Sequence, residues 1–480
     1  MARTASARTD PTTSDTDSGG KLPAIPAQVW RIAAVVIFGA FMSNLDTSLV
    51  NVGLATIGSQ MNSPLGSVQW VTNGYLLALA GALPLSGWLG RRIGVGRLWL
   101  WALVAFTVAS GLCAVAPSIE VLIALRVVQG LAGGLLTPAG QTIMGQTAGP
   151  SRMGRVMNTV GIALVLAPAL GPTIGGLLIA HLSWRWLFLI NLPVGLVAFA
   201  LGLWIVPRGE RGVAGPLDFL GFLLVGSGLP LLSYGIITAS AERNIAGASV
   251  WASMVVGILA LALFVRRSLR SPAPLLDLRL FGNRVYTAAT ISVFFTGAAL
   301  FGGMIILPLY FELLRGETVV ATGLLLASYG AGAVVAMSVG GRLTDRFGGG
   351  IVSVAGLTLT VATTVPLALF DANASLFGIE ILLFLRGIGL GLAGLPAMSV
   401  AYATVARDKL PDATGQSNIL RRVGASLGGA LFVVVLENNG RSTDVAFQTT
   451  FWWLTGASIV ALGFALWLAS EQRRATGHED

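Results

Sequence analysis

Long stretches without any charged residue are the feature of this sequence that most constrains its fold. A helix needs roughly 20 mainly apolar residues to cross the hydrocarbon core of a bilayer, and most of these stretches reach that length. The longest must hold the end of one crossing and a whole second one, separated by the polar segment 59–64. The uncharged stretches are 47–90, 98–119, 186–207, 219–241, 244–265, 285–311, 318–341, 347–370, 387–406 and 445–470.

Dividing the apolar regions in this way predicts an all-α polytopic membrane protein with fourteen transmembrane helices. An even number of spans places both chain ends on one side of the membrane. The predicted spans lie near 32–57, 68–89, 98–117, 119–142, 155–180, 184–206, 217–240, 248–265, 285–311, 320–341, 351–370, 375–402, 414–437 and 449–470.

The composition supports this assignment and excludes other classes of protein. Hydrophobic residues make up 54% of the chain and charged residues only 11%, whereas soluble proteins usually carry about a quarter charged residues. The net charge is +9, but the basic residues form short clusters between apolar runs and offer no basic face to nucleic acid. The single cysteine, Cys113, excludes a disulfide framework and a cysteine-based metal site.

The distribution of Lys and Arg predicts the orientation, because short cytoplasmic loops carry an excess of both. With a cytoplasmic N-terminal tail, the inner segments hold 22 of the 30 Lys and Arg and the outer loops hold four. The remaining four fall within predicted spans: Arg126, Arg386, Arg421 and Arg422. Both termini are therefore expected in the cytoplasm. The Arg-rich, Lys-poor composition is typical of a GC-rich bacterial genome, so the location expected is the bacterial cytoplasmic (inner) membrane.

Three internal matches at nearly one offset indicate that the chain is duplicated. The matching segments are 119–126 with 379–386, 87–94 with 341–348, and 154–158 with 415–418. Internal repeats around a midplane site are the construction that secondary transporters use for alternating access. The predicted division is a disordered cytoplasmic tail (1–29), an N-terminal six-helix bundle (30–206), a linker with two extra transmembrane helices (207–284), a C-terminal six-helix bundle (285–470) and a cytoplasmic tail (471–480).

An ordered set of motifs in the predicted spans resembles that of a known family. The segments that carry it are 45–52, 69–71 with Tyr75, 126–130, 171–176, 184–195 and 274–278. Segment 126–130 resembles motif B of the major facilitator superfamily, and 171–176 resembles its antiporter motif C. The chain is therefore similar to the fourteen-helix drug:proton antiporters, the QacA/EmrB-like branch. This resemblance implies a major facilitator fold, with two six-helix bundles and two inserted helices, and proton-coupled export.

The glycine-rich string in the fifth predicted span corresponds to motif C, and its members are Gly171, Pro172, Gly175 and Gly176. The resemblance implies a rocker face at which the two halves separate. The alternative is ordinary small-residue packing, which is common in membrane helices.

The loop after the second predicted span has the position of the family's motif A, with Gly87, Arg91, Arg92 and Gly94. The family has an acid there that caps a neighbouring helix and pairs with arginine, but this chain has Arg91. The second copy keeps Asp345 and Arg346. The inward-side latch is therefore expected on the C-terminal half, and a gating role for the N-terminal copy is left open. Independently of gating, the arginines serve topology.

Asp46 is the most informative residue of the sequence. An acid inside an apolar span costs at least about 2.5–3.5 kcal/mol and is retained where it faces a cavity or a partner. Arg126 lies at a comparable height in the fourth span and is the expected partner; motif B arginines are linked to proton coupling in the family. Asp46 is therefore expected to exchange protons and to bind substrate, and a permanent structural salt bridge with Arg126 is the alternative.

Further polar and aromatic residues are weaker candidates. Glu312 is either a second cation-attracting acid or a solvated interfacial residue. Trp70 and Tyr75 are candidates to line a substrate cavity, with a place at the membrane interface as the alternative for Trp70. The pseudo-equivalent Asn158 and Asn418 either line the cavity or form hydrogen bonds between helices. Arg421 and Arg422 are expected near the inner end of their span, with their side chains reaching the interface.

The sequence favours transport over catalysis. Neither lysine lies in a phosphate-binding loop and the two histidines are remote, so an ATP-driven pump and a metalloenzyme are not expected, and no cofactor is implied. The function expected is proton-driven export of hydrophobic or cationic compounds by a functional monomer, with protons, small substrates and membrane lipids as partners. The alternatives are a dedicated exporter of one metabolite or self-made antibiotic, and a non-transporting sensor or scaffold.

Overall fold

The computed structural model of the chain describes residues 25–149, 152–210, 212, 215–241, 248–272, 274–370, 374–438 and 443–476. These residues form sixteen α-helices and a few short helical turns, and they contain no strand. The helices are α1 (Ala27–Gln60), α2 (Leu65–Ala82), α3 (Leu85–Ile93), α4 (Val95–Ala114), α5 (Ile119–Ala148), α6 (Met153–His181), α7 (Trp186–Leu189), α8 (Asn191–Ile205), α9 (Phe219–Ala241), α10 (Ala248–Arg270), α11 (Arg284–Leu309), α12 (Val319–Phe347), α13 (Gly349–Leu369), α14 (Leu376–Ala403), α15 (Leu410–Asn438) and α16 (Thr443–Thr476). The short turns are η2 (Leu278–Gly282), η3 (Tyr310–Leu314) and η4 (Arg407–Lys409).

Each predicted span coincides with helix, but two of them are divided. Proline has no N–H and cannot continue the hydrogen bonding of a helix, and Pro84 separates α2 from α3. Helices α7 and α8 meet at Ile190 and together form one apolar segment. Among the described residues, eleven helical segments are long and apolar enough to cross a membrane. The structure therefore supports a multi-pass helical protein, while the exact number of fourteen crossings stays a prediction.

Several helices begin where a polar side chain caps the first turn. Ser118 accepts a hydrogen bond from the backbone of Val121 at the start of α5, and Ser375 caps α14 in the same way. Such caps satisfy backbone N–H groups that have no partner within the helix. Helices α5 and α14 contain the matching segments of the duplication, so the repeat extends to the way in which the helices begin.

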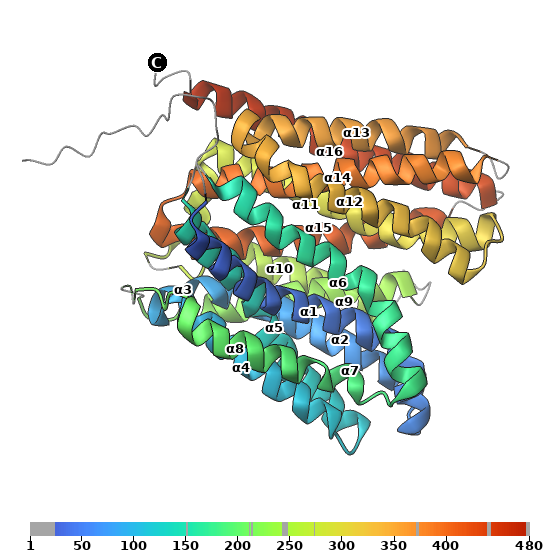
Figure 1. Ribbon diagram of the computed structural model, residues 1–480, viewed down its shortest axis with the longest axis horizontal. Coiled ribbons are helices and arrows are strands. Elements are labelled where there is room, and N and C mark those ends of the chain that lie inside the picture. The colour runs from blue at the N-terminus through green and yellow to red at the C-terminus, as the bar shows by residue number, and fades with distance from the viewer. Residues whose placement is uncertain are drawn as a thin grey trace, which may run out of the picture.

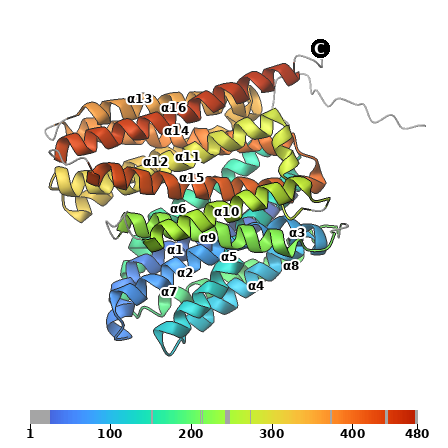
Figure 2. The ribbon, with the colours of Figure 1, turned by 180° about the vertical axis from the view of Figure 1, so that it is seen from behind.

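The helices form two groups with the same internal pairing. In the first group α1 packs against α6 and α2 against α5; in the second group α11 packs against α15 and α12 against α14. Figure 1 shows α1–α8 on one side and α11–α16 on the other. Helices α9 and α10 pack against each other, and α9 also contacts α2 and α15 (Figure 2). The inserted pair therefore lies beside the line where the two groups meet.

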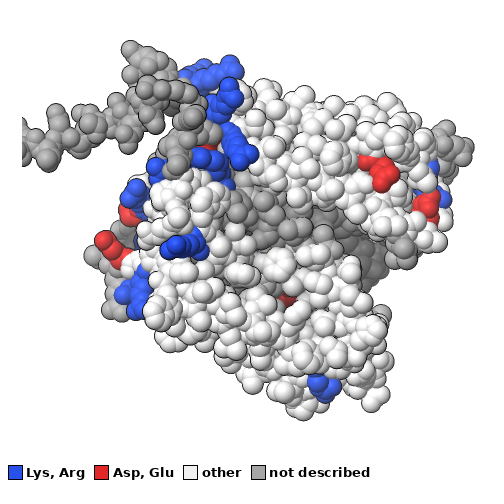
Figure 3. Space-filling view, in the orientation of Figure 1, with Lys and Arg blue, Asp and Glu red and all other residues white. Residues whose placement is uncertain are grey.

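A cleft separates the two groups over part of their length. In Figure 3 the surface is hollowed between them and opens at the end away from α3, while the blue Lys and Arg side chains gather at the α3 end. We call that end the arginine-rich end; its members include Arg91, Arg92, Arg97, Arg155 and Arg208. The groups meet there, because α15 contacts α3 and α5, and α6 contacts α12.

The chain ends differ from the predicted tails by a few residues. Helix α1 begins at Ala27, three residues before the predicted boundary, and α16 continues to Thr476 past its predicted end at 470. The rest of the predicted tails, residues 1–24 and 477–480, lies outside the described residues.

Candidate functional site

A buried ion pair lies inside the first group of helices. Asp46 of α1 and Arg126 of α5 are both fully buried, and Arg126 Nη1 donates to Asp46 Oδ2 at 2.5 Å. The sequence predicted this pair because the two residues lie at a similar depth in their spans, and the structure brings them together. A charged pair in such a place is stable only when further hydrogen bonds satisfy both groups.

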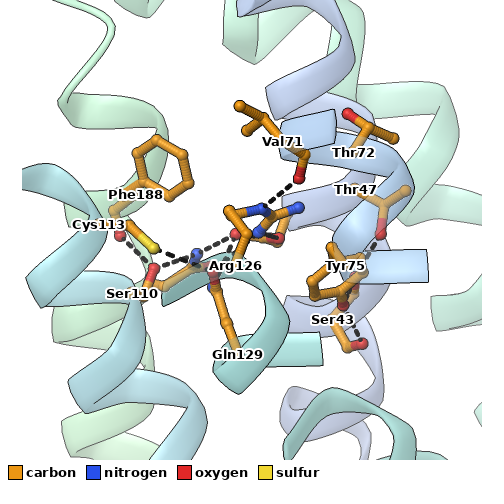
Figure 4. A network of polar contacts seen from close by, with 12 residues as sticks. Ser43, Thr47, Val71, Thr72, Tyr75, Ser110, Cys113, Arg126, Gln129 and Phe188 are labelled. Carbon is orange, nitrogen blue, oxygen red and sulfur yellow. Dashed lines mark hydrogen bonds and ion pairs between the residues drawn. The ribbon is translucent and has the colours of Figure 1, made fainter. Parts of the chain in front are cut away.

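The remaining bonds of Asp46 come from two neutral side chains. Gln129 Nε2 and Asn191 Nδ2 each donate to Asp46 Oδ1 at 3.0 Å. Asn191, the first residue of α8, also donates to the Ser110 hydroxyl of α4 at 3.0 Å, and Ser110 donates to the Phe188 carbonyl. Both carboxylate oxygens are therefore engaged, and the acid ties α1 to α5, α8 and, through Asn191, α4 (Figure 4).

Arg126 is held from several sides but retains one free position. Its Nε donates to the Val71 carbonyl at 3.1 Å, and its Nη1 also donates to Gln129 at 2.8 Å. The guanidinium lies 4.1 Å from the centre of the Tyr75 ring, a distance typical of cation–π contact. Among the described residues, Arg126 Nη2 has no hydrogen-bond partner.

Tyr75 belongs to this cluster rather than to the wall of the cleft. Its side chain is fully buried, its hydroxyl donates to the Ser43 carbonyl at 3.2 Å, and it lies 2.9 Å from the Ser43 hydroxyl. Figure 4 shows the ring beside Arg126. Tyr75 therefore covers the ion pair and fixes its position relative to α1.

The sequence did not single out Gln129, Asn191, Ser110 and Ser43. Gln129 and Asn191 do lie within the motif segments 126–130 and 184–195, and both are polar residues within apolar helices. A neutral polar side chain in a membrane helix is equally compatible with local packing, so the signal was weak. Their role depends on the acid that they reach.

Two predicted site residues lie away from this cluster. Trp70 is 41% exposed and stacks on Tyr234 of α9, with ring centres 6.2 Å apart. It therefore faces the inserted helix pair. Glu312 is exposed in η3, after α11 in the second group of helices. The structure brings neither residue to Asp46.

The matching arginine of the second group has no acidic partner among the described residues. Arg386 of α14 is buried, and it donates to the Thr364 hydroxyl at 3.2 Å and to the Ala299 carbonyl at 3.3 Å. Gly303 of α11 lies directly against it, since a Cβ at that position would approach Arg386 Nη1 to 2.7 Å. The second copy therefore holds its arginine with neutral groups.

An ion pair that the sequence did not predict joins the two groups at the arginine-rich end. Arg91 of α3 pairs with Asp412 of α15, whose side chain is buried. A Cβ at Gly87 would overlap Asp412, so the close approach of α3 and α15 requires glycine there. The sequence left a part for the N-terminal copy open, and the structure gives that copy a contact across this end: Arg91 replaces the usual acid, and the acid lies on the opposite helix.

The second latch has the polarity that the sequence led us to expect. Asp345 of α12 pairs with Arg155 of α6 at 2.5 Å, and the backbone of Gly154 and Arg155 also donates to it. A Cβ at Gly154 would lie 2.6 Å from Asp345 Oδ1. Asp345 thus lies at the first turn of α6, where a negative charge is favoured by the helix dipole.

The other predicted gating residues of these two loops act within their own group. Arg92 lies over the Trp88 ring and Arg346 over the Phe347 ring, each at 5.2 Å from the ring centre. Gly94 ends α3 at φ +90°, a left-handed conformation that glycine adopts without strain.

Above the latches, polar pairs continue the contact between the groups. The hydroxyls of Thr142 and Thr414 are 2.8 Å apart, and Asn418 Nδ2 donates to Gln141 Oε1 at 2.6 Å. Asn418 therefore bridges α15 and α5. Its counterpart Asn158 is buried in α6, donates to the Gly154 carbonyl, and lies against α12.

The motif C glycines face a helix of their own group. A Cβ at Gly171 would overlap Ser48 of α1, and one at Gly175 would lie 3.4 Å from Leu49. Gly176 has open space beside it, and the side chain of Pro172 lies outside the described part of the chain. Gly171 and Gly175 thus allow α1 and α6 to pack closely.

Arg421 and Arg422 lie deeper than the sequence suggested. Helix α15 begins at Leu410, so both residues are about three turns inside it. Both are only partly exposed. The helix starts a full turn earlier than predicted, so both arginines lie one turn deeper in it than the sequence suggested, and their reaching the interface stays a prediction.

Comparisons with known proteins agree with the fold and with the motifs. A family model described as Major Facilitator Superfamily matches residues 36–429 and, a second time, 321–478. The chain is 36% identical over 419 residues to a multidrug resistance protein B homolog of Mycobacterium tuberculosis, covering 86% of this chain and 77% of that one. It is 30% identical over 412 residues to the tetracenomycin C resistance and export protein of Streptomyces glaucescens, covering 85% and 76%.

Among solved structures, the proton:xylose symporter XylE superposes with a TM-score of 0.65 over 91% of this chain and 95% of that chain, at 14% identity. At that identity the likeness shows the fold alone. Together with the family match over most of the sequence, it identifies the chain as a multi-pass membrane protein of the major facilitator superfamily, a family of transporters and not of enzymes.

Proposed function

We propose that the protein is a proton-coupled antiporter that exports hydrophobic drugs or antibiotics by alternating access. The observation that carries this proposal is the buried Asp46–Arg126 pair, because it joins an acid to α5, the helix that also meets α15 of the second group. The relatives named for drug and antibiotic resistance support export as the direction of transport.

We further propose that the arginine-rich end is cytoplasmic, in the inner membrane of a bacterium, with fourteen crossings and both termini inside. The basis is the excess of Lys and Arg in short cytoplasmic loops and their gathering at one end of the molecule (Figure 3). In this orientation the cleft opens to the outside. The predicted division at 30–206, 207–284 and 285–470 is retained, and the protein is expected to work as a monomer.

Coupling would act through α5. This helix carries Arg126 and Gln129 at the ion pair, and about 22 Å further along it carries Gln141 and Thr142 at the contact with α15. Protonation of Asp46 removes the charge that attracts Arg126 and the two amide donors. The packing of α1 on α5 then loses its strongest polar link, and α5 is free to move relative to α15.

The placement of Asp46 limits what it can do for a substrate. A lipophilic cation was expected because a buried acid would attract it. In the structure both carboxylate oxygens are already bound and the side chain is fully buried. Asp46 is therefore proposed to couple protons, and a direct role in binding substrate would require Arg126 to move first.

The experiment uses everted membrane vesicles with an acidic interior and a pH-sensitive dye. Adding lipophilic compounds of positive, zero and negative charge is expected to release protons from wild-type vesicles for at least one class. Asp46→Asn is expected to abolish the release, and Glu312→Gln to leave it near wild type, because Glu312 is exposed and far from the pair. Proton release that survives in Asp46→Asn would exclude this acid as the coupling residue.

A second candidate is a dedicated exporter of one metabolite or self-made antibiotic. It is favoured by the relative from Streptomyces glaucescens, whose name couples resistance with export of one compound. A resistance profile in a host without its own pumps separates the two: broad protection supports multidrug export, and protection against one compound supports the dedicated exporter. A sensor or scaffold would protect against none and would move no substrate in the vesicles.

A further inference from the structure

The charges inside the protein are unbalanced. Four arginines lie within predicted spans, and Asp46 is the acid that lies deep inside one; Glu120, Asp218, Glu380 and Glu437 lie at the ends of theirs. Asp46 is paired with Arg126, and Arg386 is fully buried among neutral groups. Three of the four arginines, Arg386, Arg421 and Arg422, therefore have no acidic partner among the described residues. Arg421 and Arg422 are the two that lie side by side in one helix.

Arg422 lies on the face of α15 that meets the first group of helices. Residues four apart share one face of a helix, and Thr414 and Asn418 both contact α5 from this face. Arg422 follows one turn beyond Asn418, about 6 Å further from the arginine-rich end. Arg422 therefore lies one turn beyond the polar contacts that Thr414 and Asn418 make with α5, which places it at the closed end of the cleft.

The surroundings of Arg422 contain no acid to neutralise it. Within the described part of the chain its side chain has no hydrogen bond and no ion pair, and it is partly exposed. It lies close enough to Tyr75 to interact with it electrostatically.

Arg421 provides a second charge beside it. Its Nη2 donates to Asn418 Oδ1 at 3.3 Å, and its backbone carbonyl lies against Gly297 of α11, where a Cβ would approach it to 2.7 Å. Arg421 is therefore held towards the second group of helices. Asn418 in turn donates to Gln141 of α5, so Arg421 is connected to the contact between α15 and α5.

We propose that Arg422, with Arg421 beside it, binds the carboxylate of a lipophilic anionic or zwitterionic substrate at the closed end of the cleft. This inference rests on the proposed export function and names its substrate class. Ionisable side chains inside membrane segments are retained where they serve a function, and a planar guanidinium matches a carboxylate with two parallel hydrogen bonds. The acid that would select cations, Asp46, is already occupied.

The hydrogen bond from Arg421 to Asn418 connects anion binding to the contact between α15 and α5, which must open during the transport cycle. A carboxylate that draws Arg421 towards Arg422 competes with the Asn418 oxygen for the same guanidinium. Asn418 is then free to rotate away from Gln141, which loosens the contact between α15 and α5. Substrate would thereby help to open the end that is closed in this structure.

The test measures binding of two dyes that differ in one group: a rhodamine with a free carboxylate and its methyl ester. Purified protein is placed in phosphatidylcholine nanodiscs in chloride-free buffer, so that the dye is the available anion, and binding is followed by fluorescence anisotropy. Wild type is expected to bind the carboxylate dye about tenfold more tightly than the ester, as for a hydrogen bond to a charged group.

The variants assign that preference to one residue. Arg422→Gln is expected to weaken binding of the carboxylate dye about tenfold and to change binding of the ester little. Arg422→Lys is expected to keep part of the preference for the carboxylate dye because it keeps the positive charge. Arg407→Gln removes an arginine from the exposed η4 turn and is expected to change neither. All proteins must elute as single symmetric peaks before they are compared.

Two results would overturn the inference: tighter binding of the ester by wild type, or equal weakening of both dyes by Arg422→Gln. Proton release in vesicles is measured on the same variants. If the ester dye drives proton release and no carboxylate preference exists, the substrate class is wrong and the export function stands. If Arg422 sets a carboxylate preference but no dye releases protons, the binding site stands and proton-coupled export fails.

Discussion

Arg126 and Arg386 occupy the same position in the two copies of the repeat, but they are held by different kinds of partner. Arg126 binds Asp46, a group that can take up a proton, and the acid also ties in two amides. Arg386 binds a hydroxyl and a backbone carbonyl, which do not titrate near neutral pH. The arginine of the first half is therefore held by a partner of opposite charge, and the arginine of the second half is held by neutral groups among the described residues.

The two cytoplasm-side latches, in the orientation proposed, repeat the contrast at the surface. The pair Asp345–Arg155 has its acid on the second half and its base on the first. In the pair Arg91–Asp412 the acid is again on the second half. Both ion pairs therefore have the same polarity: the first half supplies the arginine and the second half supplies the aspartate.

The largest expected effect separates the two buried arginines. Arg126→Leu leaves the Asp46 carboxylate buried without a counter-ion, which costs about 3–5 kcal/mol of stability. Arg386→Leu removes a buried cation that has no acidic partner in the described structure, so its cost is expected to stay near or below about 1 kcal/mol. Thermal unfolding of both purified variants in the same detergent measures the difference.

The double variant Asp46→Asn with Arg126→Leu serves as the control for that difference. It removes both charges, so most of the stability lost in Arg126→Leu is expected to return. Equal losses in Arg126→Leu and Arg386→Leu would mean that side-chain packing, and not the unpaired acid, dominates both sites. The difference between the two halves would then not be electrostatic.

The next effect tests the polarity of the latches. Arg91→Asp places two acids together at Asp412 and is expected to weaken the closed end by about 2–3 kcal/mol, because Asp412 is buried. Adding Asp412→Arg restores an ion pair in the opposite direction and is expected to recover most of the loss. Spin labels on α3 and α15 report the closed fraction by distance measurement.

The same exchange at the other latch is not expected to work as well. Asp345 also accepts from the backbone at the start of α6, and an arginine in its place cannot accept those hydrogen bonds. Full recovery in the swapped Asp345→Arg, Arg155→Asp protein would show that helix capping contributes little there. The two latches would then be equivalent.

Sequence reasoning found what hydrophobicity and spacing determine. The helices follow from the apolar runs, and the meeting of Asp46 and Arg126 follows from their equal height in neighbouring spans. The Arg91–Asp412 pair could not be found in this way, because it joins residues from different halves whose approach depends on Gly87. The stacking of Trp70 on Tyr234 of the inserted α9 could not be found either, because it joins residues from two separate parts of the chain.

The predicted start of α15 was also in error, and with it the depth of Arg421 and Arg422 inside that helix. The span with Arg421 and Arg422 was predicted to start near 414, whereas α15 starts at Leu410. Polar residues in the first turn, including Asp412, hid the true start from an apolar window. A shift of one turn places both arginines deeper in the helix, and the carboxylate-binding role proposed for Arg422 depends on that depth.

A smaller effect tests the glycine that stands beside Arg386. Gly303→Ala adds a Cβ that would lie 2.7 Å from the Arg386 guanidinium, and overpacking of this kind costs about 1–2 kcal/mol. Gly323→Ala in α12 has open space and is expected to be neutral or slightly stabilising. Similar melting temperatures for both would show that Arg386 moves freely and is not held by its neutral partners.

The smallest effect concerns the segment that connects the halves. Asp277 pairs with Lys409 at 2.7 Å, joining the end of the linker to the turn η4 that precedes α15 in the second half. Burial alone would raise the pKa of Asp277, but the Lys409 ammonium and the Arg279 backbone N–H outweigh it and hold that pKa below its usual value. Because the folded pKa is lowered, the stabilisation is complete above the unfolded value of about 3.9 and is lost as pH falls through the folded pKa.

Asp277→Asn is therefore expected to lower stability at neutral pH by less than about 1 kcal/mol, since the pair is partly solvated. Asparagine can still cap η2, so only the charge is removed. The difference from wild type is expected to disappear below the ordinary aspartate range, and Asp408→Asn, next to Lys409 but exposed, is the matched control. A loss that persists in acid would assign the effect to packing of the connection, and the two halves would then be joined by more than the contacts that open and close.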